Sequence, residues 1–101
     1  MNPLKSRKLV TIVTEAALER TLIEDLHTLG VSGYTLCEAR GEGSRGVRRG
    51  DWTYNGNIRV EVVCSEDRAH RLMAHLTENY YANYAMIAYM SEVMVLRPEK
   101  F

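Results

Sequence analysis

Four segments of the chain show the hydrophobic patterns of β-strands. Residues 9–14 (LVTIVT) are apolar and mostly β-branched, which is typical of a buried strand. Residues 58–64 alternate apolar side chains with others and give the clearest period-two pattern in the chain. Residues 33–39 show a shorter alternation, and the apolar run AMIAYMSEVMVL predicts a last strand over residues 85–96. We therefore expect four strands.

Two segments between these strands have the spacing of amphipathic helices. In residues 15–29 the apolar face is made of Leu18, Leu22, Ile23, Leu26 and Leu29. Thr14 is the predicted N-cap of this helix and Gly30 its C-terminal glycine. A second helix is predicted after Ser65, which suits an N-cap, and it ends between residues 79 and 83. Its apolar face comprises Ala69, Leu72, Met73, Leu76 and Tyr80.

The order strand–helix–strand–strand–helix–strand is that of the ferredoxin-like α+β fold. In this plan two helices cover one face of a four-stranded antiparallel sheet. We expect residues 1–101 to form one such domain. We also expect apolar residues on the uncovered face of the sheet, namely Val10, Ile12 and part of residues 86–94. Other copies of the chain would be the simplest cover for that face.

The overall charge excludes a broad polyanion-binding surface. The chain of 101 residues has 13 Lys and Arg against 13 Asp and Glu, whereas non-specific nucleic-acid binding needs a strongly basic surface. No apolar run reaches membrane-spanning length, and residues 1–8 are basic without the apolar stretch of a signal peptide. The two cysteines, Cys37 and Cys64, are expected to be buried reduced thiols, and we expect a cytoplasmic protein without direct membrane insertion.

Positive charge and glycine are concentrated in the connection between the second and third strands, residues 41–56. Its first part, with the preceding residue, reads RGEGSRGVRRG over residues 40–50. Glycines let the backbone approach a ligand, successive N–H groups can form an anion-binding nest, and guanidinium groups match phosphate oxygens. The pattern is neither a P-loop nor a dinucleotide-binding fingerprint. Composition alone leaves two interpretations open: a small anion site and a solvated hairpin connection.

Four stretches of the sequence together resemble one known family. They are KLVTIVTE at residues 8–15, GYT at 33–35, GEGSRGVR at 41–48 and NYYANYAMIAYMSEV at 79–93. They resemble the PII-like signalling proteins of bicarbonate uptake and carboxysome systems. The chain looks most similar to the carboxysome-associated PII and SbtB-like subgroup.

The resemblance implies a homotrimer with adenine nucleotides in the clefts between subunits. The implied ligands are ADP, AMP, ATP or cAMP together with bicarbonate, and no other cofactor. Residues 41–56 would be the T-loop, which orders according to the ligand and contacts a protein target, such as a bicarbonate transporter or a carboxysome component. The function implied is regulatory and not enzymatic.

The resemblance also implies a set of site residues. Nucleotide phosphate and bicarbonate would be held by Gly41, Gly43, Ser44, Arg45, Gly46 and Arg48. Ribose and base would lie near Tyr34 and Thr35, with the adenine edge read by the backbone at Ile87, Ala88 and Tyr89. Trp52 and Tyr54 could contact a protein partner from the loop, or fold back onto its base.

The sequence departs from relatives of this subgroup in two respects. It lacks the tyrosine-bearing loop apex and basic base-loop motif of nitrogen-sensing PII proteins, which puts uridylylation and 2-oxoglutarate sensing in doubt. It also lacks the CGPxGC tail of many SbtB proteins, which weakens the transfer of the transporter partnership.

Two other function classes can be weighed from the residues. A slow adenine-nucleotide phosphohydrolase would need a metal carboxylate set, and no catalytic or metal-binding constellation is evident in the sequence. The three histidines, His27, His70 and His75, are interpreted as solvated helix residues. An RNA-binding ferredoxin-like module would carry aromatic residues on its middle strands, whereas the third strand here reads IRVEVVC.

Overall fold

The computed structural model describes residues 3–41 and 56–101. The strands are β1 (Lys5–Glu15), β2 (Thr35–Ala39), β3 (Asn57–Cys64) and β4 (Ile87–Val95). The helices are α1 (Glu19–Thr28) and α2 (Glu66–Asn79), with short 3-10 turns η1 (Ala16–Leu18) before α1 and η3 (Pro98–Lys100) after β4. The order of elements is the one that the hydrophobic pattern predicts.

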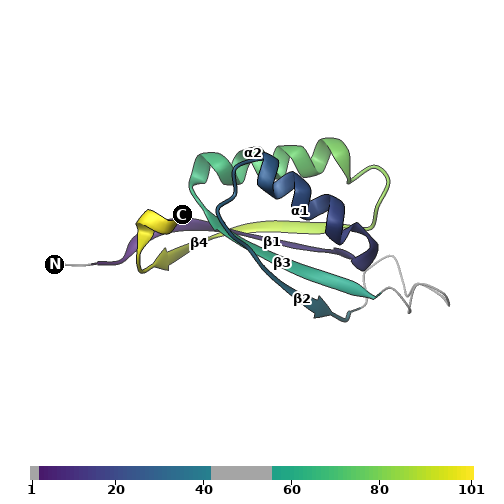
Figure 1. The fold of residues 1–101 in the computed structure, drawn as a ribbon, viewed down its shortest axis with the longest axis horizontal. Helices are drawn as coiled ribbons and strands as arrows, with labels where there is room; N and C mark the ends of the chain where they lie inside the picture. Colours follow the sequence, from purple (N-terminus) through teal and green to yellow (C-terminus); the bar gives the residue numbers. More distant parts are fainter. Residues whose placement is uncertain (1–2, 42–55) are drawn as a thin grey trace.

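The strands form one antiparallel sheet in the order β2-β3-β1-β4. Figure 1 shows α1 and α2 side by side on one face of this sheet, and no other element of the described residues covers the opposite face. The predicted ferredoxin-like α+β fold is therefore confirmed.

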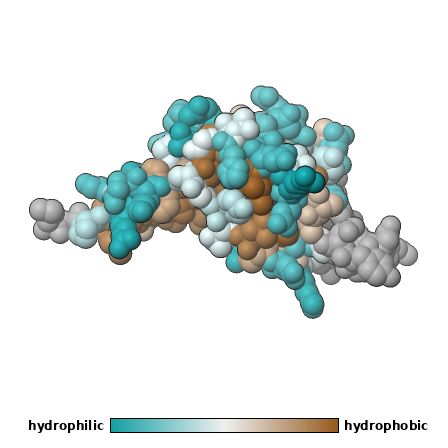
Figure 2. Space-filling view, in the orientation of Figure 1, coloured by the Kyte–Doolittle hydropathy of each residue, from teal (hydrophilic) through white to brown (hydrophobic). Residues whose placement is uncertain are grey.

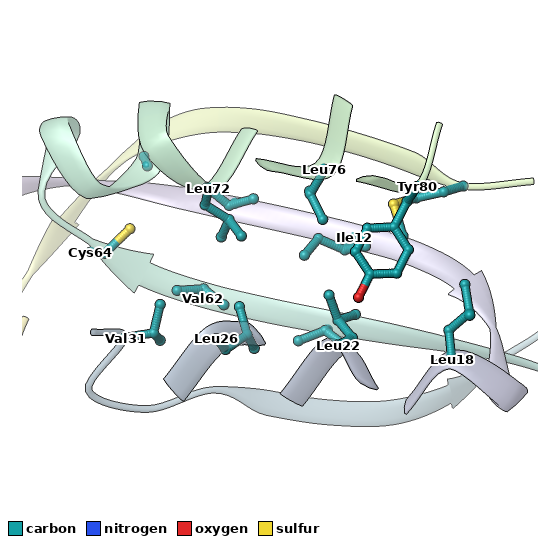
Figure 3. Packing of buried hydrophobic residues seen from close by; sticks show 14 of the residues in the cluster. Ile12, Leu18, Leu22, Leu26, Val31, Val62, Cys64, Leu72, Leu76 and Tyr80 are labelled. Carbon is teal, nitrogen blue, oxygen red and sulfur yellow. The ribbon is translucent and has the colours of Figure 1, made fainter. Parts of the chain in front are cut away.

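The core lies between the two helices and the covered face of the sheet (Figure 3). Alternate residues of the central strands face the helices, so Val10, Ile12, Val60 and Val62 are fully buried. They pack against the leucine faces of the helices, which include Leu22, Leu26, Leu72 and Leu76. Because both helices bury their apolar stripes here, their polar faces point to solvent.

One expectation about the uncovered face is wrong. Val10 and Ile12 were expected there, but both are fully buried on the face that carries the helices. Residues directly opposite in an antiparallel pair share a face, and Ile12 lies opposite Val60 of the core. The uncovered face instead carries the intervening residues, among them Thr11, Ile87 and Tyr89, of which the last two are exposed.

The predicted capping residues match the structure at two of three places. At the end of α1, Gly30 has a φ of 80°, and hydrogen bonds run from Gly30 N to His27 O and from Val31 N to Leu26 O. This is a Schellman motif. Ser65 caps α2 by accepting a hydrogen bond from Arg68 N at 3.2 Å. Thr14, however, is no N-cap, because β1 continues through Glu15 and the buried Thr14 side chain makes no cap hydrogen bond.

β1 begins at Lys5, four residues before the predicted strand. The polar residues at its start pair with the end of β4, where Lys5 lies opposite Val95 and Ser6 opposite Met94. Figure 1 shows that these paired ends extend beyond the helices as an arm, and Figure 2 shows hydrophobic surface on it. Arg7 ties η3 to the arm, since its Nη2 donates to Pro98 O at 3.0 Å. Backbone pairing, and not burial, therefore defines this part of β1.

Candidate ligand-binding site

Most of the predicted anion site lies outside the described residues. This applies to Gly43, Ser44, Arg45, Gly46 and Arg48, and also to the predicted partner contacts Trp52 and Tyr54. Gly41 alone of this set is described, and it is exposed, with open space where a side chain would stand.

The two flanks of the anion segment meet at one end of the sheet. Ala39, near the end of β2, pairs with Asn57 at the start of β3. Asn57 also pairs with Glu15 of β1. Gly56, with a φ of 62°, accepts a hydrogen bond through its carbonyl from Ala16 N at 3.1 Å. The β2–β3 pairing thus holds the two flanks together, and the flank that leads into β3 is also bonded to the start of η1.

The residues predicted to lie near ribose and base occupy the two outer strands of the sheet. The register places Thr35 of β2, Glu61, Thr11 and Tyr89 of β4 in one row. Tyr34 precedes β2 and is exposed, as are Ile87 and Tyr89. The strands β3 and β1 lie between, so three strand spacings of roughly 4.8 Å separate the two groups by about 14 Å. Within one chain the predicted residues share a sheet but no single pocket.

Ala88 differs from its two neighbours on β4. Its side chain packs against the core, and it lies opposite Ile12. Its backbone, and not its side chain, therefore lies at the outer edge of β4. Its N–H group donates to the hydroxyl of Tyr81 at 2.8 Å. Tyr81, in the connection between α2 and β4, was not among the predicted site residues, because nothing in the sequence shows that its side chain turns back to the strand.

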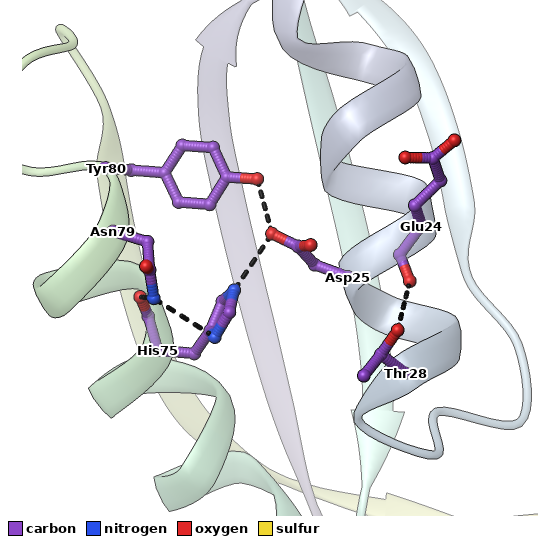
Figure 4. A network of polar contacts seen from close by, with 6 residues as sticks. All are labelled: Glu24, Asp25, Thr28, His75, Asn79 and Tyr80. Atoms are coloured by element: carbon purple, nitrogen blue, oxygen red, sulfur yellow. Dashed lines mark hydrogen bonds and ion pairs between the residues drawn. The ribbon is translucent and has the colours of Figure 1, made fainter.

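A cluster of polar side chains joins α1 to α2 through hydrogen bonds (Figure 4). Asp25 Oδ2 on α1 accepts hydrogen bonds from Tyr80 OH at 2.5 Å and from His75 Nε2 at 2.8 Å. The Asn79 amide nitrogen lies 3.2 Å from His75 Nδ1, and an amide NH2 can only donate. This arrangement fits the tautomer of His75 in which Nε2 is the donor to Asp25. The expected solvated state of His75 is wrong, since it bridges α2 to α1.

The environment of this cluster shifts the acidity of Tyr80. Burial, and then the hydrogen bond to the carboxylate of Asp25, raise the pKa of the Tyr80 phenol above its usual value near 10. The proton thus stays on the phenol, which keeps donating to Asp25.

One of the two cysteines, Cys37, departs from expectation. Cys64 is buried, and burial raises the pKa of its thiol, but Cys37 is exposed. Cys37 lies opposite Arg59, whereas Cys64 lies opposite Lys8 of β1. Both are free thiols. Among residues 3–41 and 56–101, no group of His, Cys, Asp or Glu side chains is placed to hold a metal ion.

The length and hydropathy of a helix decide whether it can span a membrane. Neither α1 nor α2, nor any other helix in the described part of the chain, has the length and apolar character needed to span a membrane.

The fold, with a long glycine- and arginine-containing connection between β2 and β3, is consistent with the class of PII-like signalling proteins. The profile of the family "Nitrogen regulatory protein P-II" matches residues 7–100. The chain belongs to this family, whose members are regulatory proteins.

Solved structures support the same assignment. A PII-like signalling protein from Thermus thermophilus is 49% identical, with a TM-score of 0.84, and the match covers 99% of both chains. CPII from Thiomonas intermedia, solved with ADP and bicarbonate, has a TM-score of 0.84 at 24% identity, with 97% of this chain and 96% of that chain covered. The apo form of CPII has a TM-score of 0.77 at 20% identity, over 94% and 97% of the two chains. The CPII likeness concerns the fold.

Proposed function

We propose that this chain is a trimeric PII-like regulator that binds an adenine nucleotide, above all ADP or AMP, together with bicarbonate in the clefts between subunits. One observation carries the proposal. The candidate residues for ribose and base lie on or directly beside the two outer strands, β2 and β4, about 14 Å apart across the sheet. Each chain then offers two half-sites, and a neighbouring copy would complete each of them.

The exposed face of the sheet favours such an assembly. Ile87 and Tyr89 of β4 are more than half exposed on the uncovered face of the sheet. A subunit interface would remove this apolar area from water. A trimer about a three-fold axis is the arrangement that the family resemblance implies.

The chemistry of residues 41–48 suits the proposed anions. Arg45 and Arg48 supply forked cationic donors that match both a phosphate and the planar edge of bicarbonate. Gly41, Gly43, Ser44 and Gly46 would supply backbone N–H groups and a hydroxyl as further donors. Nucleotide bound by this segment would order it for bicarbonate, so that each ligand raises the affinity for the other. CPII, of the same fold, has been solved with ADP and bicarbonate together.

Ordering of residues 41–56 would be the output of the regulator. Trp52 and Tyr54 would then be presented to, or withdrawn from, a protein target in the cytoplasm. The resemblance to the carboxysome-associated PII and SbtB-like subgroup points to inorganic-carbon uptake or carboxysome function as the process regulated.

Isothermal titration of the purified chain with ADP, with and without bicarbonate, tests this function. Loss of a charge-assisted hydrogen bond typically costs about 1.5–3 kcal/mol, so Arg45→Ala should weaken ADP binding by about tenfold or more. Arg71→Ala is the matched control, because Arg71 is an exposed arginine of α2 that pairs with Asp67 at 3.1 Å, within its own helix. Light scattering should give the mass of three chains. Absence of ADP binding by the wild type at millimolar concentration would overturn the proposal.

A further inference from the structure

Tyr81 has a defined position at the start of the last strand. Its backbone N–H donates to Leu76 O at 3.2 Å, which fixes it at the end of α2. Its side chain is 44% exposed, and its hydroxyl accepts the N–H of Ala88 at 2.8 Å. The phenol is thus held against the edge of β4 while its ring remains accessible from solvent.

The edge that Tyr81 contacts is unpaired within the described part of the chain. β4 is the outer strand of the sheet, next to β1 only. In an antiparallel pair, the N–H and C=O of one residue point to the same side. Because the N–H of Ala88 points to Tyr81 and not to Ile12 opposite, the carbonyl of Ala88 also points to this outer edge.

A tyrosine hydroxyl that accepts one hydrogen bond still has its own proton to donate. The edge therefore displays two neighbouring groups of opposite polarity: an O–H donor from Tyr81 and a C=O acceptor from Ala88. A ligand that matches both must offer an acceptor beside a donor.

Adenine offers this pattern on its Watson–Crick edge, with the ring nitrogen N1 as acceptor and the 6-amino group as donor. Guanine and hypoxanthine offer the reverse, an N–H donor beside a carbonyl acceptor. Guanine and hypoxanthine would set a carbonyl oxygen against the carbonyl of Ala88 and an N–H against the Tyr81 proton, which disfavours both bases.

We infer that Tyr81 is the residue that selects the base: its hydroxyl donates to N1 of adenine while the carbonyl of Ala88 accepts from the 6-amino group. This inference rests on the proposed nucleotide-binding function and adds the side chain that distinguishes adenine from guanine. The contact with the Ala88 N–H orients the phenol before ligand arrives, so little rotational freedom is lost on binding.

The test compares Tyr81→Phe with Tyr84→Phe. Tyr84 lies in the same connection and is similarly exposed, at 41% against 44%, but its ring packs beside Tyr80. Calorimetry with ADP, GDP and IDP should show that the wild type and Tyr84→Phe prefer ADP. In Tyr81→Phe the preference for ADP over GDP should fall by about tenfold, which corresponds to one buried hydrogen bond left unmade.

A ligand-side variant keeps the test independent of any effect on folding. ADP in which carbon replaces N1 (1-deaza-ADP) should bind the wild type about tenfold more weakly than ADP, and Tyr81→Phe should bind both equally, as expected for two partners of one contact. Equal binding of ADP and 1-deaza-ADP by the wild type would overturn the role of Tyr81. An unchanged ADP preference in a folded Tyr81→Phe would do the same. Failure of the wild type to bind ADP at all would instead overturn the proposed function.

Discussion

The phenol of Tyr80 and the carboxylate of Asp25 are joined by a hydrogen bond of 2.5 Å across the two helices. His75 donates to the same carboxylate oxygen at 2.8 Å (Figure 4). Two donors on one oxygen fix the position of the Asp25 side chain, and the cluster closes the helical layer above the core. The two helices are thus joined by directional hydrogen bonds at this point, in addition to the apolar packing of their buried faces on the core.

Replacing Asp25 should therefore destabilise the fold. Asp25→Ala leaves two partly buried donors without their acceptor, which typically costs about 1–3 kcal/mol. Urea denaturation followed by circular dichroism measures the loss. Glu24→Ala is the control, since the exposed Glu24 side chain makes a long ion pair of 4.0 Å with Arg20. Equal midpoints for the two variants would contradict a stabilising role for the Asp25 cluster.

The raised pKa of Tyr80 gives a prediction for alkaline pH. A group with a higher pKa in the folded than in the unfolded state contributes stability below its unfolded pKa, near 10, and loses that contribution as pH rises beyond it. The free energy of unfolding should thus begin to fall as pH rises through about 10 and should keep falling toward the higher pKa of the folded state, less steeply in Tyr80→Phe than in the wild type. Tyr84→Phe should keep the wild-type slope. The prediction fails if Tyr80→Phe and the wild type have the same slope.

Gly30 and Gly33 provide a matched pair at the turn after α1. Gly30→Ala should destabilise by about 1–2 kcal/mol, because an L side chain is strained at a φ of 80°. Its new Cβ would also lie 3.3 Å from Arg68 Nη2. Gly33→Ala meets nothing within 4 Å and should be near neutral. Thermal unfolding of both variants checks this, and a loss as large in Gly33→Ala would refute the conformational explanation.

Cys64 should be chemically inert in the folded protein. Its side chain is 2% exposed, and desolvation raises the pKa of its thiol, so little thiolate is available to react. In a Cys37→Ser variant, labelling by a disulfide reagent should be slow in buffer and fast in urea. Rapid labelling in buffer would show that the end of β3 opens independently of the core. A Cys37→Ser, Cys64→Ser double variant gives the reagent background.

The sequence predicted the features that local chemistry determines. Ser65 and Gly30 act within a few residues of themselves, so their roles could be predicted from the neighbouring residues alone. The face of the sheet on which Val10 and Ile12 lie could not be predicted in this way. The run LVTIVT has apolar residues at both its odd-numbered and its even-numbered positions. Only pairing with β3, where Val60 and Val62 are buried, decides which parity faces the helices.

The contacts that sequence reasoning missed join distant residues. Asp25 lies 50 residues from His75 and 55 from Tyr80, so no periodicity relates them. The contact between Tyr81 and Ala88 depends on how the connection after α2 folds back to β4. The register of β2 against β3 likewise places Cys37 opposite Arg59 and not near Cys64. Each of these follows from tertiary geometry that a one-dimensional pattern does not contain.

Because of the hydrogen bond from Ala16 N to Gly56 O, a residue outside the connection can be used to monitor residues 42–55. An amide held by such a bond exchanges its hydrogen only when the bond opens. Ala16 belongs to η1, on the well-packed side of that bond. The exchange rate of the Ala16 amide, or its chemical shift in a nuclear magnetic resonance spectrum, would therefore report on opening of the bond to Gly56. No label on residues 42–55 is needed for this measurement.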